Sequence, residues 1–191
     1  MIIGIQGAMG SFNEKACKKF CLKRGITGHK IAYLVSTENV LREISAGTVQ
    51  LGIFAVSSSR QGFVEETEKA MKKYGGKFEK IDELTISIEH VLLGLKKLAR
   101  GEYERIVSHP QALKEHGLFL KKAFPNAELL GAEDTALPAR LLKEGHFGSK
   151  TLVLATKECA ELYGLEIVEK NLPLNKGYFA TFYLVRKKQG Q

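Results

Sequence analysis

The sequence predicts an α/β fold of two lobes, each built on a mostly parallel sheet with flanking helices. Short apolar runs alternate along the chain with amphipathic stretches, which is typical of repeated β-α units. Residues 51–56 are continuously apolar, as expected of a strand buried on both faces of a parallel sheet. Residues 84–95 form a run too long for one ordinary strand, so we expect it to cross between lobes. We predict one lobe from residues 1–84 and 170–191, the other from residues 85–169, and a ligand cleft between them.

The first half of the chain supplies the predicted elements of the first lobe. Apolar residues such as Ala16 and Phe20 recur at helical spacing and predict a helix. Thr37 is placed to cap a second helix, and Gly75 and Gly76 to end a third. The expected helices cover residues 13–24, about 38–46 and about 64–74, and the expected strands cover residues 2–6, 31–34, 51–56 and 84–95.

The same alternation continues in the second half. A short strand stops at Ser108, and Pro110 suits the first turn of the following helix, because its missing N–H would have no partner there. Gly164 is placed to end the last helix. The expected strands cover residues 106–107, 128–130, 151–154, 165–168 and 178–186, and the expected helices cover residues 112–124, 136–143 and 157–163.

Composition narrows the class of partner. The net charge is +8, but the Lys and Arg residues are dispersed over polar helix faces and no nucleic-acid recognition motif accompanies them. No apolar run approaches the length of a membrane span, and the first strand begins without a leader. Three cysteines, an odd number, give no disulfide framework and fit a reducing cytoplasm. We expect a cytoplasmic protein with no nucleic-acid or membrane partner, and leave a homodimer open.

Metal and cofactor chemistry finds little support in the sequence. Cys17 and Cys21 lie one helical turn apart and could share a metal, but no third and fourth ligand follow at metal spacing. Small core residues are the better interpretation. Gly7 and Gly10 match no complete phosphate-binding fingerprint. We therefore expect neither a metal nor a cofactor.

Four turns from a strand to a helix carry small polar residues. Helix N-termini present unpaired N–H groups and a partial positive charge, and ligands of open α/β sheets sit beyond the carboxyl ends of the strands. Hydroxyl and carboxamide groups at these turns suit an anion with one or two carboxylates. Each hydroxyl could instead be only a helix cap, and His109 or His90 only a buried, hydrogen-bonded imidazole. The candidate ligand-binding residues are Ser11, Ser59, Ser108, His109, Gln111 and Thr135.

These motifs resemble the catalytic domain of the prephenate dehydratase family over essentially the whole chain. Residues 108–113 match the family's Ser-His-Pro-Gln-Ala-Leu motif outright, and residues 7–12 are similar to its Gly-Pro-x-Gly-Thr-Phe/Tyr opening. Residues 134–136 and 163–165 resemble its Ser/Asp-Thr-Ala and Tyr-Gly-Leu segments, and His90 falls where the family has a His. The resemblance implies a fold similar to type II periplasmic binding proteins. It also implies that prephenate, bound in the cleft, loses its ring hydroxyl and carbon dioxide to give phenylpyruvate for phenylalanine biosynthesis, without a cofactor.

The chain departs from the family at two turns. In the family's Pro-Ile-Glu-Asn-Ser turn, Ser57 and Ser58 replace the carboxylate and the carboxamide. In its Phe-Thr-Arg-Phe segment, Ala180 stands where the resemblance assigns a Thr that assists departure of the ring hydroxyl. Thr181 is adjacent, but neighbouring strand residues face opposite ways, so only a register slip or a bulge would turn it inward. The regulatory domain that usually follows in the family is not expected here.

Three functions remain open at this point. The first is a carbon–oxygen lyase of the prephenate dehydratase type that uses Thr181, Ser58 or Ser57 as rearranged catalytic donors. The second is a related lyase, such as a prephenate decarboxylase that leaves the ring hydroxyl in place. The third is a non-catalytic protein that binds the carboxylate of an aromatic precursor. The resemblance over the whole chain favours the first.

Overall fold

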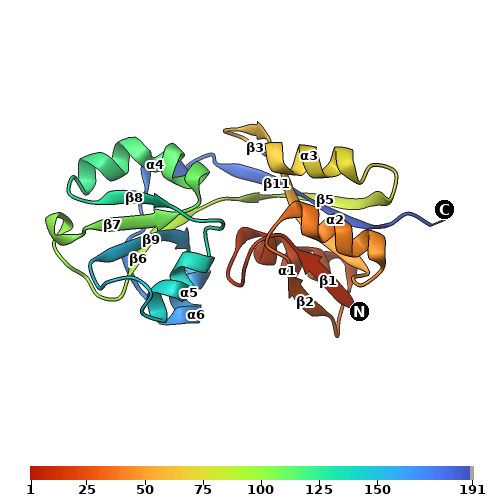
Figure 1. Cartoon of the computed structure of the whole chain (residues 1–191), viewed down its shortest axis with the longest axis horizontal. Coiled ribbons are helices and arrows are strands. Elements are labelled where there is room, and N and C mark those ends of the chain that lie inside the picture. The colour runs from red at the N-terminus through yellow and green to blue at the C-terminus, as the bar shows by residue number, and fades with distance from the viewer. Residues whose placement is uncertain (190–191) are drawn as a thin grey trace. The chain divides into compact units, whose positions relative to one another are not determined.

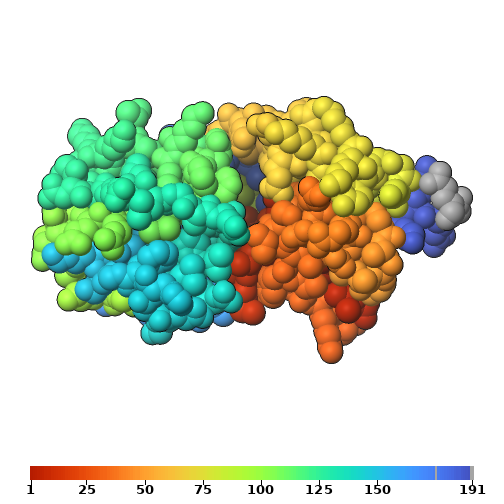
Figure 2. Space-filling model, viewed as in Figure 1, coloured from red at the N-terminus to blue at the C-terminus, as the bar shows by residue number. Residues whose placement is uncertain are grey.

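The computed structural model describes residues 1–189, and its contacts divide the chain into two units (Figure 1, Figure 2). Unit 1 comprises residues 1–8, 12–88 and the chain from Tyr178 onward, and unit 2 comprises residues 9–11 and 89–177. The divisions after residues 88 and 177 lie a few residues beyond those expected after residues 84 and 169. The short stretch at residues 9–11 groups with unit 2, although its neighbours in the sequence group with unit 1.

Unit 1 is a six-stranded sheet with helices on both faces. Its elements are β1 (Ile2–Ile5), α1 (Phe12–Arg24), β2 (Lys30–Tyr33), α2 (Thr37–Ala46), β3 (Leu51–Ser58), β4 (Gly62–Phe63), α3 (Glu65–Lys73), β5 (Phe78–Ser87) and β11 (Phe179–Lys187). The strands follow the order β2-β1-β3-β11-β5, with β4 paired to β3. β1 is parallel to β2 and β3, whereas β11 runs antiparallel between β3 and β5.

The core of unit 1 lies on both faces of this sheet. On one face, Phe12, Phe20 and neighbouring residues of α1 pack with Ile53 of β3. On the other face, α2 and α3 pack with Phe54, the next residue along the same strand. A strand between two helical layers has no polar face, which explains why residues 51–56 are continuously apolar. The predicted burial of this run on both faces is therefore confirmed.

Unit 2 is a five-stranded sheet. Its elements are β6 (His90–Gly94), the 3₁₀ helix η1 (Arg100–Glu102), β7 (Arg105–Ser108), α4 (Pro110–Ala123), β8 (Glu128–Gly131), α5 (Leu137–Lys143), β9 (Thr151–Thr156), α6 (Lys157–Tyr163), β10 (Glu166–Glu169) and the 3₁₀ helix η2 (Pro173–Asn175). The strand order is β10-β6-β9-β7-β8. β7 is parallel to β8 and β9, while β6 runs antiparallel to β9 and β10. Leu113 and Leu120 of α4 are buried in its core with Leu154 of β9.

Three details of the expected fold need correction. Both sheets are mixed rather than mostly parallel, because β11 and β6 run against their neighbours. The single strand expected at residues 84–95 is two strands, since β5 ends at Ser87 and β6 begins at His90. Ser36, not Thr37, caps α2: its Oγ accepts a hydrogen bond from the Asn39 amide at 3.2 Å. The α/β class and the division into two units otherwise stand as expected.

Candidate active site

The predicted site residues fall into two groups, one in each unit. In unit 2 they gather where the parallel strands β7, β8 and β9 end. Ser108 is the last residue of β7, and its carbonyl accepts a hydrogen bond from the Ala132 amide at 2.9 Å, just past the end of β8. Parallel strands share one carboxyl edge, so α4, which follows β7, starts at that edge together with the turn after β8. The edge therefore brings Ser108, His109, Gln111 and the Thr135 turn to one end of the sheet.

Ser108 is fully buried and its hydroxyl has an internal partner. The Oγ atom donates to the carbonyl of Leu154 on β9 at 2.6 Å. This bond fastens β7 to β9 at the residue that precedes the cap of α4. The serine thus holds the helix start in place, and its role as a ligand residue stays a prediction.

His109 and Gln111 form the first turn of α4. His109 is the helix cap, and its Nδ1 accepts a hydrogen bond from the Gln111 amide at 3.2 Å, which puts the proton of the neutral imidazole on Nε2. The Gln111 side chain is half-buried and donates through Nε2 to Glu115 Oε1, one turn later, at 2.9 Å. Glu115 is a polar partner that the sequence reasoning missed; its i+4 spacing from Gln111 was the available signal.

The turn after β8 is organised by Asp134 rather than by Thr135. The buried Asp134 carboxylate accepts hydrogen bonds from the amides of Ala136 at 2.6 Å and Leu137 at 2.7 Å. It therefore satisfies the amides that open the short helix α5. Thr135 is half-buried and lies between these residues, so its hydroxyl is not the helix cap.

The stretch at residues 9–11, which carries Ser11, is held by α6 and its cap. The Thr156 hydroxyl donates to the Gly10 carbonyl at 2.6 Å, and the Tyr163 hydroxyl donates to the Met9 carbonyl at 3.2 Å. Ser11 itself is buried. Gly10 has a positive φ of 87°, and a Cβ there would lie 2.7 Å from the Cys159 sulfur, so only glycine fits. The Tyr163 contact therefore joins the Tyr-Gly-Leu segment to the Gly-x-x-Gly opening.

Two buried histidines lie in contact within unit 2. His90 Nδ1 and His116 Nε2 are 3.2 Å apart, and the rings meet edge to face with their centroids 5.2 Å apart. Burial, with a smaller contribution from repulsion by His116, lowers the pKa of His90 from 6.5 to about 3. Two buried rings that hydrogen-bond to each other act as a packing element. The buried-imidazole interpretation of His90 therefore fits this geometry.

In unit 1 the predicted donors meet at the end of β3. The register of β3 and β11 places Ser58 opposite Ala180 and Ser57 opposite Thr181. The register shifts between Thr181 and Phe182, so β3 carries an extra residue there and β11 continues regularly against β5. This irregularity is a bulge in β3, so it changes the facing of Ser57 and Ser58 and does not turn Thr181 inward.

Ala180 and Thr181 face opposite sides of the sheet. Ala180 is 8% exposed and packs with Phe182 and Ile86 on the α1 side. Thr181 is on the other side, where its Oγ1 lies 2.9 Å from Oγ1 of Thr85. Thr181 therefore does not take the place of a side chain at position 180.

Ser59 links the end of β3 to the start of β11 by hydrogen bonds. Its Oγ accepts a hydrogen bond from the Phe179 amide at 3.0 Å, and its own amide donates to the Phe179 carbonyl at 2.9 Å. The Ser58 Oγ accepts from the Gln61 amide at 3.1 Å. The hydroxyls of this turn stabilise its shape, and their proposed chemistry is not tested by these contacts.

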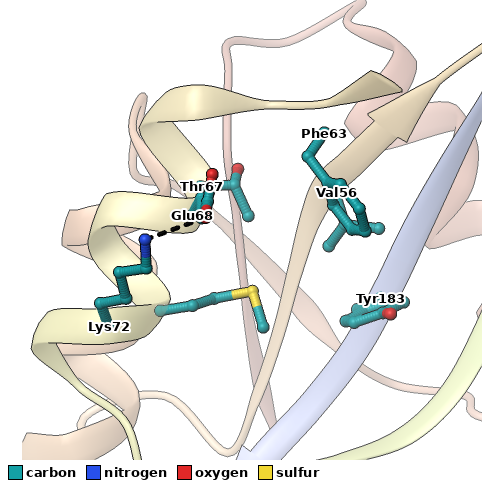
Figure 3. A pocket seen from close by; sticks show the side chains of 7 residues that line it. Val56, Phe63, Thr67, Glu68, Lys72 and Tyr183 are labelled. Atoms are coloured by element: carbon teal, nitrogen blue, oxygen red, sulfur yellow. Dashed lines mark ion pairs between the residues drawn. The ribbon is translucent and has the colours of Figure 1, made fainter. Parts of the chain in front are cut away.

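A pocket of about 320 Å³ lies elsewhere in unit 1, between α3 and the sheet (Figure 3). An ion pair of 2.9 Å between Lys72 and Glu68 borders its otherwise largely apolar wall. No predicted site residue lines this pocket, and no sequence motif indicated it. The lining residues are Val56, Phe63, Thr67, Glu68, Met71, Lys72 and Tyr183.

Comparison with known proteins decides the family. The sequence model for prephenate dehydratase matches residues 3–190, nearly the entire chain. The chain belongs to the prephenate dehydratase family. It is 29% identical over 180 residues to the prephenate dehydratase of Methanocaldococcus jannaschii, covering 94% of this chain and 62% of that protein. It is 26% identical over 182 residues to the bifunctional chorismate mutase/prephenate dehydratase of Buchnera aphidicola, subspecies Schizaphis graminum, covering 95% of this chain and 46% of that protein. The chain thus spans about half to two thirds of these relatives.

Solved structures of the family share the fold. The prephenate dehydratase of Arthrobacter aurescens in complex with L-Phe superposes with a TM-score of 0.83 at 20% identity, covering 100% of this chain and 61% of that one. A periplasmic substrate-binding protein of an ABC transporter from Coxiella burnetii superposes with a TM-score of 0.51 at 15% identity, covering 98% and 84%. The expected likeness to periplasmic binding proteins is confirmed. Among residues 1–189, no helix combines the length and the apolar character needed to cross a membrane.

Proposed function

We propose that this protein is a lyase that converts prephenate to phenylpyruvate. The observation that carries the proposal is the family motif at residues 108–113, which folds here as a strand end fastened by Ser108 and a helix start capped by His109. The 14-residue helix α4 presents its N-terminus at the carboxyl edge of the sheet, a position that favours a carboxylate. The bound L-Phe of the relative from Arthrobacter aurescens supports a small carboxylate ligand in this family.

The reaction requires one proton at the ring hydroxyl. The bond from the ring to the carboxylate breaks and releases carbon dioxide, its electron pair enters the ring, and the carbon–oxygen bond breaks as the hydroxyl leaves with an added proton as water. In this chain the hydroxyls proposed to assist that departure are Thr181, Ser57 and Ser58. Assistance by positioned donors of this kind is general acid catalysis.

A different outcome is favoured by one specific observation. Ala180 has no hydroxyl, and Thr181 faces the opposite side of β11. In the decarboxylase alternative the ring keeps its hydroxyl, carbon dioxide leaves, and the electron pair of the broken bond is taken up by a proton added to a ring carbon. A protein that only binds the precursor is the other.

Product analysis separates these functions. The purified protein is incubated with prephenate near neutral pH, with a protein-free sample as the control because prephenate aromatises spontaneously in acid. We expect phenylpyruvate above the control. A non-aromatic decarboxylated acid would instead support the decarboxylase, and binding without turnover would support the non-catalytic binder.

Binding of prephenate should depend on Gln111. We expect Gln111→Ala to weaken prephenate binding about tenfold or more, because one hydrogen bond to a charged group contributes about 1.5–3 kcal/mol. Titration calorimetry of the parent and the variant measures this effect. Lys114→Ala, an exposed change on the same helix, is the matched control and should leave the affinity unchanged. Equal affinities for Gln111→Ala and the parent would show that Gln111 only orients Glu115.

We also propose a cytoplasmic location. Cys17, Cys21 and Cys159 are all free and buried, which supports the reducing cytoplasm expected from the sequence. Ligand binding by the protein alone, or by a homodimer, is decided by measuring mass in solution with and without prephenate.

A further inference from the structure

The loop after α1 folds His29 back onto two cysteines of that helix. Cys17 and Cys21 occupy successive turns of α1, and the amide of Ile26 donates to the Cys21 carbonyl at 2.9 Å as the helix ends. Gly25 and Gly28 then adopt φ values of 63° and 65°, which glycine tolerates best. The chain therefore reverses within a few residues and enters β2 directly after His29.

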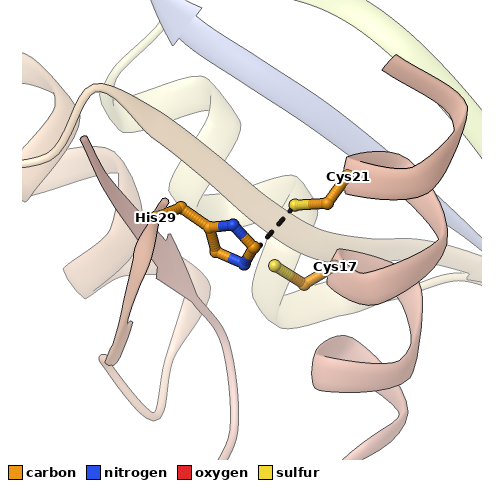
Figure 4. A group of neighbouring side chains, drawn as sticks. All are labelled: Cys17, Cys21 and His29. Carbon is orange, nitrogen blue, oxygen red and sulfur yellow. Dashed lines mark hydrogen bonds between the residues drawn. The ribbon is translucent and has the colours of Figure 1, made fainter. Parts of the chain in front are cut away.

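The three side chains offer their ligand atoms to one point. Their ligand atoms all lie within 4.8 Å of one another, and Figure 4 shows the imidazole turned toward both sulfurs. The His29 Nε2 atom is 3.6 Å from the Cys21 sulfur. Zinc bonds sulfur at about 2.3 Å and imidazole nitrogen at about 2.0–2.1 Å, so a sulfur and a nitrogen on one tetrahedral zinc ion are about 3.6 Å apart. The thiol–imidazole hydrogen bond of the metal-free cluster thus already has the separation that two ligands of one zinc ion require.

Burial of the cluster needs an explanation beyond packing. Cys17 is fully buried and Cys21 is 6% exposed. The Nδ1 atom of His29 is buried and has no hydrogen-bond partner among the described residues. The ring nitrogen that approaches the Cys21 sulfur is Nε2, at 3.6 Å, so Nε2 rather than Nδ1 is the atom offered to an ion shared with the two thiols.

A disulfide does not account for the pair of cysteines. Side chains four residues apart on a helix have Cβ atoms about 5–6 Å apart, whereas a disulfide needs about 3.5–4.5 Å. Cys17 and Cys21 are accordingly both free thiols in the structure.

We propose that Cys17, Cys21 and His29 bind a thiophilic divalent cation, with zinc as the occupant. Two thiolates and one imidazole are a set that zinc uses, and the half-exposed His29 leaves access for a solvent molecule as the fourth ligand. Such an ion would tie α1 to the start of β2 and stabilise unit 1. No third ligand follows the cysteines at metal-motif spacing in the sequence, but the fold brings His29 beside them.

Titration with Co²⁺ and Zn²⁺ tests the site on the intact protein. We expect one equivalent of Co²⁺ to give a thiolate-to-metal charge-transfer band, one equivalent of Zn²⁺ to abolish it, and Zn²⁺ to raise the melting temperature. Cys17→Ser and Cys21→Ser should remove the band. His29→Gln should weaken Zn²⁺ binding at least tenfold, since even partners of metal ligands are typically worth ten- to a hundredfold.

The control is Cys159→Ser, which removes the third buried thiol of the chain and should leave the band unchanged. Circular dichroism checks that each variant is folded. If Cys17→Ser does not fold, His29→Gln decides the matter, because it alters a half-exposed side chain. The absence of a thiolate band in the parent, or a band and affinity unchanged by His29→Gln, would overturn the proposal.

Discussion

Restoring the family's side chains at four positions is expected to raise phenylpyruvate formation by about a hundred- to ten-thousandfold, the usual contribution of a positioned acid or hydrogen-bond donor. The variant combines Ser57→Glu, Ser58→Asn, Ala180→Thr and Thr181→Arg. The structure gives these changes a common place, because Ser58 lies opposite Ala180 and Ser57 opposite Thr181. The four positions form two neighbouring cross-strand pairs. The changes are made together because the effects of residues that share a reaction are not additive.

Among the four changes, we expect the hydroxyl introduced by Ala180→Thr to have the largest effect. Ala180 points to the α1 side with Phe182, and the neighbouring Thr181 does not reach that side. Ala180→Thr alone is therefore expected to give part of the gain. Ala180→Val is the matched control, because valine has the shape of threonine without its hydroxyl. Steady-state rates with prephenate, corrected for the uncatalysed reaction, compare the variants.

Two outcomes would count against this account. Equal rates for Ala180→Thr and Ala180→Val would mean that added bulk, not a donor, changes the reaction. A fourfold variant that folds and binds prephenate but makes no phenylpyruvate above the uncatalysed rate would mean that loss of these donors is not what limits the chemistry. The non-catalytic binder would then become the better proposal.

The sequence predicts an element correctly where the pattern of apolar residues within that segment is enough to define it. The run at residues 51–56 is apolar because both of its faces are covered, and the structure confirms this. The apolar run at residues 84–95 does not define its elements in this way. Its apolar residues belong first to β5 and then to β6, and the break at residues 88–89 coincides with the change from unit 1 to unit 2. A change of unit has no local composition signal, so the two strands appear as one.

The candidate site shows the same limit. The motif at residues 108–113 is local, and its residues do form a helix start. The partners of that motif are not local. Leu154, which binds the Ser108 hydroxyl, is 46 residues away, and Thr156 is 146 residues from the Gly10 carbonyl that it binds. The register between paired strands brings such partners together, and the hydrophobic pattern of the sequence alone does not determine that register. The pairing of Ser57 with Thr181 depends on an extra residue in β3, which no periodicity predicts.

Stability is expected to fall as the pH drops below about 6.5, because of the buried pair His90 and His116. In the folded protein the pKa of His90 is lowered from 6.5 to about 3, first by burial and then by repulsion from His116. Between these values the unfolded chain binds a proton that the folded chain does not bind. This contribution to stability is therefore complete above pH 6.5 and is lost as the pH falls toward 3. At about pH 5 the loss is about 2 kcal/mol, since each pKa unit corresponds to about 1.4 kcal/mol.

Urea unfolding near pH 7 and near pH 5 measures this loss as a difference within each variant, so that any static effect of a substitution cancels. The parent should lose about 2 kcal/mol between the two pH values through this group. His90→Gln removes the titrating ring and should show a correspondingly smaller loss, even if it is less stable at both pH values. His146→Gln is the matched control, because His146 is exposed and lies outside the buried pair. If His90→Gln loses as much stability between the two pH values as the parent and the His146→Gln variant do, the acid sensitivity arises outside the buried pair, and His90 is protonated in the folded protein more readily than its burial implies.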